Sequence, residues 1–278
     1  MPVKNPIGVM QGRLLPKYMG RYQAHPVGCW QDEFGIASGL NLELIEFILD
    51  FEDAWLNPLM TEAGCKQIRQ TSEAAGVRVV SICADYFMDA PLHDRNPDTV
   101  VESQNVLRRL IENAPILEVA DIVIPCVDQS SLNDDDDFQR LIEGLSPIIE
   151  NADRANVNFS LETDLEPTRF ARLLDEFGSS RVTVNYDIGN SASLGYSVAE
   201  EFDAYGPRIS DVHIKDRTLG GGSVVLGTGA ADIGRTLELL YEHNFAGPFI
   251  LQAYRDDEGL AIFKSQFAWF TNLANDVH

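Results

Sequence analysis

The chain has few cysteines and lacks a long apolar run. Its four cysteines, Cys29, Cys65, Cys83 and Cys126, are widely spaced and form no Cys-x-x-Cys pair. This spacing argues against a zinc finger and favours reduced thiols over a disulfide framework. No N-terminal segment resembles an apolar signal peptide, and no run approaches the roughly 18 apolar residues of a membrane span. We therefore expect a cytoplasmic protein that does not enter a membrane.

Basic residues are also scarce. The sequence has 21 lysines and arginines against 43 aspartates and glutamates, which gives a net charge of −22. Such an acidic surface repels phosphate backbones, so sequence-independent binding of nucleic acid is not expected. The same acidity is a common solubility feature and leaves small-molecule substrates open.

Strand-like and helix-like patterns alternate along the 278 residues. The expected strands are Pro6–Met10, Leu44–Leu49, Val77–Cys83, Ile122–Val127, Val157–Glu162, Val182–Asp187, Ile209–Ile214 and Phe249–Leu251. The expected helices are Thr61–Ala75, Pro97–Ala114, Asp136–Ala155, Glu166–Phe177, Val198–Tyr205, Ala231–His243 and Glu258–Asn275, after a short first crossover, Cys29–Gly39. Eight such units predict an α/β fold, a closed (β/α)8 TIM barrel forming one domain over residues 1–278. A doubly wound open sheet is the alternative, although no Gly-x-Gly-x-x-Gly follows the first strand.

Four strands in the second half end in a residue that can bind a divalent cation: Glu162, Asp187, His213 and Gln252. The C-terminal strand ends of a parallel barrel converge on one face, so these side chains are expected to meet there. Carboxylates and imidazole suit a divalent cation, whereas the amide of Gln252 offers an oxygen but no carboxylate chemistry.

Structural roles stay open for each of these four residues. A buried Glu162 without a partner would be costly, which favours a metal or catalytic role over a salt bridge. Asp187 could instead cap the following segment. His213 could be a hydrogen-bonded core residue, and Gln252 could bond a neighbouring strand.

Cationic side chains follow two of the strands. Lys215 and Arg217 suit a substrate oxyanion or phosphate, or else a salt bridge with Asp211 or Asp216. Arg13, at the catalytic end of the first strand, could bind the same anion or stabilise the barrel mouth.

Further candidates lie near strands two and three. We interpret Glu46 and Asp85 as rim carboxylates, each a replacement acid or base or an ordinary hydrogen-bonding group. His93, in an Ala-Pro-Leu-His loop, could reach a substrate hydroxyl or simply lie on the surface. Trp30 and Phe87 would form either an apolar wall at the mouth or part of the core.

Two loops are distinctive. The glycines at 220–222 indicate a mobile loop after the seventh strand, either a lid or an ordinary connection. The acidic run Asn133–Asp137 precedes a helical pattern and is typical of an N-terminal cap that complements the helix dipole, with a calcium site as the minor alternative.

Several motifs, taken in this order and at barrel spacing, resemble the sugar phosphate isomerase/epimerase family of xylose isomerase-like TIM barrels. They are Met10-Gln-Gly-Arg-Leu14, Leu44-Ile-Glu-Phe47, Leu161-Glu-Thr163, Tyr186-Asp-Ile-Gly-Asn190, Val212-His-Ile-Lys-Asp-Arg217, and Leu226-Gly-Thr-Gly229 before Asp232. The resemblance implies one divalent ion (Mn, Mg, Co or Zn) held by Glu162, Asp187, His213 and, in place of the family's second glutamate, Gln252.

The resemblance also implies a small carbohydrate substrate, such as a sugar, a ketose or a sugar phosphate. Isomerisation or epimerisation would proceed by proton transfer next to a carbonyl, with Glu162 as general base, and the family implies a homo-oligomer. Because Gln252 replaces a glutamate, a sugar or polyol dehydratase and a non-catalytic sugar-binding barrel stay open. A DNA-repair endonuclease fits poorly, since that relative uses a histidine-rich multi-zinc site and this chain has five histidines.

Overall fold

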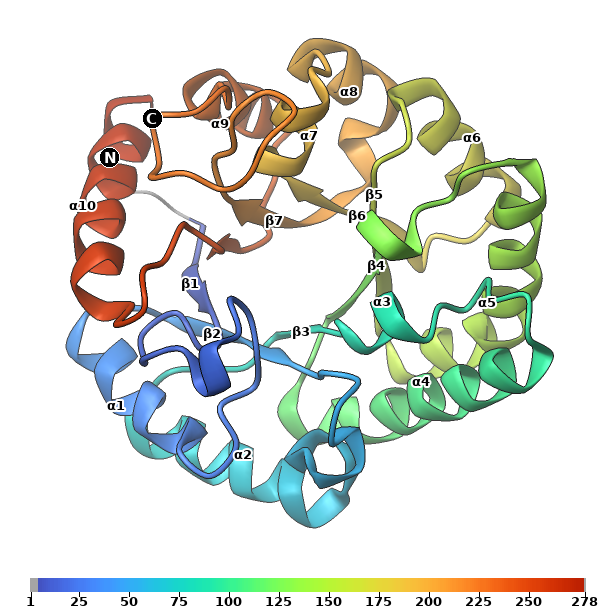
Figure 1. The fold of residues 1–278 in the computed structure, drawn as a ribbon, viewed down its shortest axis with the longest axis horizontal. Coiled ribbons are helices and arrows are strands. Elements are labelled where there is room, and N and C mark those ends of the chain that lie inside the picture. The colour runs from blue at the N-terminus through green and yellow to red at the C-terminus, as the bar shows by residue number, and fades with distance from the viewer. Residues whose placement is uncertain (1–4, 278) are drawn as a thin grey trace.

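The computed structural model describes residues 5–277 and contains a closed barrel of eight parallel strands (Figure 1). Neighbouring strands follow the sequence order, and β8 closes the ring by pairing with β1. The strands are β1 (Ile7–Met10), β2 (Leu44–Ile48), β3 (Ser81–Cys83), β4 (Asp121–Cys126), β5 (Asn158–Thr163), β6 (Val182–Asp187), β7 (Ile209–Ile214) and β8 (Phe249–Leu251). The predicted (β/α)8 barrel is confirmed, and the open-sheet alternative is wrong.

Helices surround the strands as an outer ring (Figure 1). The longer ones are α1 (Trp30–Gly39), α2 (Glu62–Ala75), α4 (Pro97–Leu117), α5 (Asp135–Ala155), α6 (Pro167–Phe177), α8 (Val198–Tyr205), α9 (Ile233–Glu242) and α10 (Leu260–Val277). The Asp134 side chain caps α5 by accepting the N–H of Asp137, so the acidic run is a helix cap as expected. Two short helices were not predicted: α3 (Tyr86–Asp89) and α7 (Ile188–Leu194), which are too short to show a clear apolar period.

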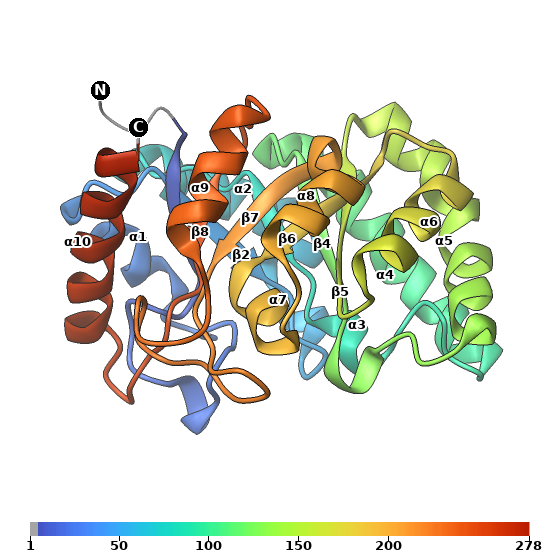
Figure 2. The same ribbon diagram turned by 90° about the horizontal axis from the view of Figure 1, so that it is seen from above.

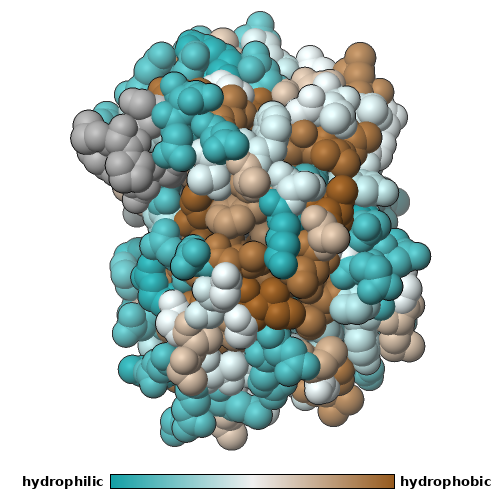
Figure 3. Space-filling view, turned by 90° about the vertical axis from the view of Figure 1, so that its left-hand side faces the viewer, coloured by the Kyte–Doolittle hydropathy of each residue, from teal (hydrophilic) through white to brown (hydrophobic). Residues whose placement is uncertain are grey.

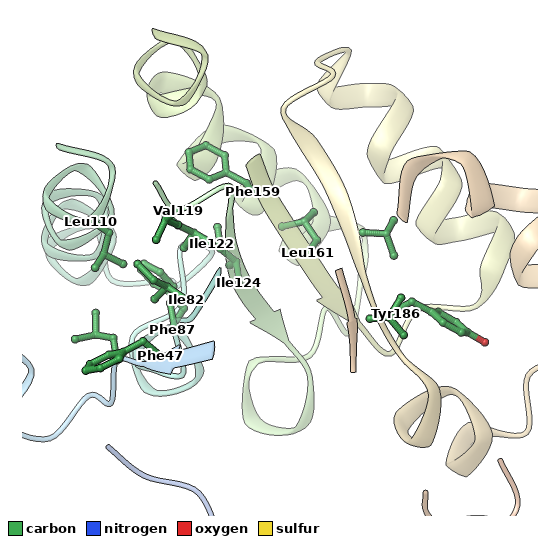
Figure 4. Packing of buried hydrophobic residues seen from close by; sticks show 14 of the residues in the cluster. Phe47, Ile82, Phe87, Leu110, Val119, Ile122, Ile124, Phe159, Leu161 and Tyr186 are labelled. Carbon is green, nitrogen blue, oxygen red and sulfur yellow. The ribbon is translucent and has the colours of Figure 1, made fainter. Parts of the chain in front are cut away.

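The alternation of side chains along each strand divides the buried apolar residues into two layers. The larger layer lies between the strands and the helices, where Ile122, Phe159 and Leu161 pack (Figure 4). The smaller layer lies inside the barrel and contains Met10, Leu44, Ile48, Cys83, Val123 and Ile250. In β2, for example, Ile45 and Phe47 belong to the outer layer while Leu44 and Ile48 belong to the inner one, as a period of two requires.

The inner apolar layer comes from β1–β4 and β8. On β5–β7 the outer positions are apolar and the alternate positions are polar and buried: Ser160, Glu162, Asn185, Asp187, Asp211 and His213. The inner apolar residues are therefore concentrated on β8 and β1–β4, although these strands also carry the buried polar residues Glu46, Ser81 and Asp121. This division places the ionisable groups of the chain's second half on one side of the barrel.

One side of the molecule, which carries α10 and α1, shows an apolar area surrounded by hydrophilic residues (Figure 3). Helix α10 buries Phe263 and Phe270 against the barrel but leaves Trp269 37% exposed. A helix that is apolar on more than one face commonly marks a contact surface. Within residues 5–277, no helix is long and apolar enough to cross a membrane.

The loops after β1 and β7 project from the same end of the barrel, at the lower edge of Figure 2. The loop after β7 is held at its base by Asp216, whose side chain is fully buried. The carboxylate accepts backbone N–H groups from Gly227 (2.9 Å), Gly229 (2.8 Å) and Ala231 (3.1 Å). The predicted mobile loop around the three glycines is therefore anchored, because three charge-assisted hydrogen bonds close its base.

We expect Gly229→Ala to destabilise this loop. A Cβ at position 229 would lie 2.2 Å from the Asp216 carboxylate, whereas one at Gly222 would meet no atom within 4 Å. Gly229→Ala should lower the free energy of unfolding by ~1–3 kcal/mol and expose the loop to protease, while Gly222→Ala should leave both nearly unchanged. Chemical denaturation and limited proteolysis measure the two effects. Equal behaviour of the two variants would contradict the anchoring role of Asp216.

Candidate active site

Three ionisable side chains from consecutive strands meet at the C-terminal end of the barrel. Glu162 ends the buried part of β5, Asp187 ends β6, and His213 lies one residue before the end of β7. One donor atom from each lies within 4.8 Å of the other two, and all three side chains are buried. The His213 Nδ1 atom is 3.7 Å from the Glu162 carboxylate and 4.0 Å from that of Asp187. The structure thus brings together the three residues predicted from strand ends, while their role as metal ligands stays a prediction.

Both ring nitrogens of His213 have hydrogen-bond partners. Its Nε2 atom lies 2.8 Å from the Glu46 carboxylate, which also accepts a hydrogen bond from the Ser81 hydroxyl at 2.6 Å. A carboxylate can only accept, so Nε2 carries the proton, and Nδ1 accepts a hydrogen bond from the side-chain amide of Asn185 at 3.1 Å. The prediction that Glu46 is a rim residue is wrong, because it lies in the middle of β2 with its side chain directed into the barrel and fully buried.

Two amides that the sequence analysis did not single out hold the Glu162 carboxylate. Asn185 donates to one oxygen at 3.1 Å and Asn190 donates to the other at 2.5 Å. Burial raises the pKa of Glu162 to about 7, and the nearby charge of Asp187 adds to this effect. Asn185 could have been found from the sequence, because it precedes Asp187 by two residues and so shares its face of β6.

Lys215 and Arg217 both reach the same region, from the segment that follows β7. The ammonium of Lys215 lies 3.0 Å from Asp187. Burial lowers the pKa of Lys215, but the carboxylates of Asp187 and Glu162 outweigh this and hold it above its ordinary value.

Arg217 donates to the side-chain oxygen of Asn190 and to the Gly221 carbonyl, each at 2.8 Å. Among residues 5–277 it pairs with no carboxylate, so the salt bridge considered with Asp211 or Asp216 is absent. Asp211 lies inside the barrel and Asp216 is occupied by the loop, which leaves neither free for Arg217.

Gln252 is held by a second glutamine. Its Nε2 donates to the Gln23 side-chain oxygen at 3.0 Å, which leaves the Gln252 Oε1 atom buried without a hydrogen-bond partner. The same Gln23 oxygen accepts from Arg13 at 2.8 Å, and the Gln23 amide donates to Asp85 at 2.8 Å. Gln23 comes from the loop after β1, and no sequence pattern pointed to it.

Arg13 is hydrogen-bonded to the chain at the barrel mouth, and its contact with a substrate anion stays a prediction. It donates to the carbonyls of Ala253 and Tyr22, each at 3.1 Å, as well as to Gln23. Its side chain is almost fully buried, and burial lowers the pKa of Arg13 to about 10. Three of its five N–H groups are thus used within the protein.

These side chains surround a cavity of about 430 Å³ at the barrel mouth, a size that suits a small-molecule ligand. Its lining includes Arg13, Gln23, Asp85, Glu162, Lys215, Arg217 and Gln252. The lining is rich in polar and charged groups, which suits a hydroxylated ligand.

Three predicted candidates lie away from this cavity. His93 does not line it and is buried rather than on the surface, because its loop packs against α5, where the His93 carbonyl accepts from Arg140. Trp30 packs edge-to-face against Phe47 and belongs, like Phe87, to the outer apolar layer. The prediction that His93 contacts a substrate is therefore not supported by its position, and the two aromatic residues are core.

Comparison with known proteins agrees with this architecture. Among curated proteins, the chain is similar to the L-ribulose-5-phosphate 3-epimerase UlaE of Salmonella paratyphi A, with 25% identity over 254 residues that cover 86% of this chain and 87% of the relative. Among solved structures, an L-ribulose 3-epimerase has a TM-score of 0.74 at 16% identity, covering 98% of this chain and 95% of that one. The IolI protein with a bound zinc atom has a TM-score of 0.78 at 13% identity, covering 98% and 99%.

Likeness to the two solved structures, at such low identity, shows a common fold. The family model of the xylose isomerase-like TIM barrel matches residues 34–273, which is most of the chain. The match confirms the resemblance that the strand-end motifs indicated. The chain belongs to the xylose isomerase-like TIM barrel family.

Proposed function

We propose that this protein is a divalent-cation-dependent epimerase of a small ketose or ketose phosphate. The observation that carries the proposal is the meeting of Glu162, Asp187 and His213 within 4.8 Å, beside a polar cavity of about 430 Å³. The similarity to proteins named as L-ribulose-5-phosphate 3-epimerase and L-ribulose 3-epimerase supports the reaction class. These names favour inversion at a carbon over the elimination that a dehydratase would catalyse.

The residues present fit a divalent cation. Two carboxylates and an imidazole are common ligands for such ions, and His213 Nδ1 lies 3.7 and 4.0 Å from the two carboxylates. A bound cation would displace the Asn185 amide that Nδ1 accepts from at 3.1 Å. The buried, unpartnered Oε1 atom of Gln252 is available as a neutral fourth oxygen. A bound divalent ion would polarise a substrate carbonyl and offset the negative charge that develops on it.

Glu162 is placed to act as the general base. It lines the cavity, and its two oxygens are oriented by the amides of Asn185 and Asn190. Burial raises the pKa of Glu162 to about 7 without a cation, and a bound cation would lower this pKa, which favours the ionised, proton-accepting form at neutral pH. Glu162 would remove the proton from the carbon next to the carbonyl, leaving an enediolate.

Arg217 is the candidate for recognising a substrate anion. Its guanidinium lines the cavity and, among residues 5–277, has no carboxylate partner, so its charge is uncompensated within the protein. Lys215, although close by, is committed to Asp187. A phosphate on the substrate would supply the missing partner for Arg217.

The binding of a cation is tested most directly with His213→Ala. Chelator-treated wild-type protein should bind Mn²⁺ in a calorimetric titration, and His213→Ala should bind it at least about tenfold more weakly because one ligand is lost. The matched control is His243→Ala, an exposed histidine at the end of α9. Epimerisation of L-ribulose 5-phosphate by wild-type protein should stop after chelation and resume on adding Mn²⁺. Wild-type protein that binds no divalent ion would contradict the proposal.

Arg217→Ala separates phosphorylated from neutral substrates. We expect KM for L-ribulose 5-phosphate to rise about 10–100-fold, as for a lost charge-assisted hydrogen bond, with a smaller change for L-ribulose. Arg217→Lys, which keeps the charge but loses the planar fork, should give an intermediate KM for the phosphate. Equal losses for both sugars would show that Arg217 mainly holds the loop through Gly221.

A further inference from the structure

The glutamine at position 252 leaves the proposed epimerisation short of one proton carrier. Inversion at a carbon requires that the proton removed from one face be replaced on the other. The amide of Gln252 neither takes nor releases a proton near neutral pH. Unless Glu162 serves both faces, another group on the cavity wall must deliver the second proton.

Five carboxylates line the cavity: Asp50, Asp85, Asp89, Asp128 and Glu162. Asp50 has charged and hydrogen-bonding partners that favour its ionised form. It forms an ion pair with Arg21 at 3.3 Å and accepts the backbone N–H of His25 at 2.7 Å. Asp89 and Asp128 are exposed, where water stabilises their charged forms. Apart from Glu162, this leaves Asp85 as the shielded carboxylate.

Asp85 is half-buried and follows the end of β3 by two residues. Within residues 5–277 no cation forms an ion pair with it; its neighbours are the amide of Gln23 at 2.8 Å and the thiol of Cys83 at 3.2 Å. Burial raises the pKa of Asp85. A shielded carboxylate with only neutral donors holds a proton more readily than one beside a cation.

Gln23 links Asp85 to the position where the family's second glutamate would lie. Its oxygen accepts from both Arg13 and Gln252, so the amide orientation is fixed and its nitrogen must point towards Asp85. Asp85 and Gln252 thus share one rigid hydrogen-bonding partner. Gln252, directly after β8, and Asp85, two residues after β3, are therefore linked through a single side chain.

We propose that Asp85 is the second acid–base group of this site, a role that rests on the epimerase function proposed above. Glu162 takes the proton from the carbon next to the carbonyl, and the C–H electron pair becomes the carbon–carbon double bond of the enediolate. Asp85, in its acid form, then gives its proton to the opposite face, and the carbonyl re-forms. Glu162 ends protonated and Asp85 ionised, and exchange with water resets both groups.

Asp85 and Glu162 reach the cavity from different segments of the barrel. Asp85 follows β3 and Glu162 lies on β5, with β4 between these strands, and both side chains line the same cavity. A planar enediolate between them would present one face to each carboxylate.

The test is Asp85→Asn, assayed with L-ribulose 5-phosphate and L-ribulose in D2O. Formation of the C3 epimer should fall about 100-fold or more, as for a lost general acid, while Glu162 still exchanges the C3 hydrogen of the starting sugar for deuterium within about threefold of the wild-type rate. Glu162→Gln should abolish both exchange and inversion. Asp203→Asn, which removes the same charge from an exposed position on α8 that does not line the cavity, should change neither.

Unchanged epimer formation by Asp85→Asn would overturn the proposal. A parallel loss of exchange and inversion, with an unchanged melting temperature, would also overturn it, since it would show a positioning role. If Asp85→Asn melts at a lower temperature, Asp85→Glu replaces it: reduced inversion with intact exchange supports the role, and equal loss of both rejects it. Wild-type protein that neither exchanges nor inverts either sugar would reject the epimerase function itself.

Discussion

The burial of carboxylates inside the barrel is the constraint on which this site depends. Glu46, Glu162, Asp187 and Asp211 are all nearly or fully inaccessible to solvent. Unpaired charges at such depth are expensive, and in the described chain the ammonium of Lys215 is the permanent cation that pairs with one of them. Hydrogen bonds from amides and one imidazole stabilise part of the remaining negative charge. A divalent cation would neutralise most of the rest, so the proposed ligand would stabilise the fold as well as take part in the chemistry.

His213 connects the two halves of this charged interior. Its Nε2 proton is directed to Glu46, while its Nδ1 atom accepts from Asn185 and lies 3.7 Å from the Glu162 carboxylate at the mouth. The deeper carboxylate therefore fixes both the tautomer and the ring orientation of the histidine, as second-shell carboxylates do in many metal sites. The buried polar side chains inside the barrel, Glu46 of β2 among them, thus support the mouth, whereas the inner apolar residues supply ordinary packing.

Much of this arrangement could be predicted from the sequence, and the reason is the period of two along the strands. In β5 and β6 the apolar residues alternate with polar ones that end in Glu162 and Asp187, so parallel strand order alone brings these carboxylates together. Sequence reasoning failed where loop conformation decides. His93 was expected near a substrate, but its loop turns towards α5. Gln23 was not found, because its position depends on how the loop after β1 folds back over the mouth.

Glu46 shows a different limit of sequence reasoning. Its strand was predicted within one residue, yet the carboxylate was assigned to the rim. Depth along a strand cannot be judged from a strand's residues alone, because it depends on how far neighbouring strands are staggered in the closed barrel. In the closed barrel Glu46 pairs with Met10 of β1, and its side chain is fully buried.

The closure of the loop after β7 by Asp216 has a consequence for how new specificities arise in this barrel. Three backbone N–H groups at the far end of the loop bind one carboxylate at its start. The two ends are therefore fixed to each other independently of the residues between them. Insertions, deletions or grafted sequences between Arg217 and Leu226 would alter the wall of the cavity without pulling on the strands. The loop can thus vary as a separate module while the barrel and its carboxylates stay in place.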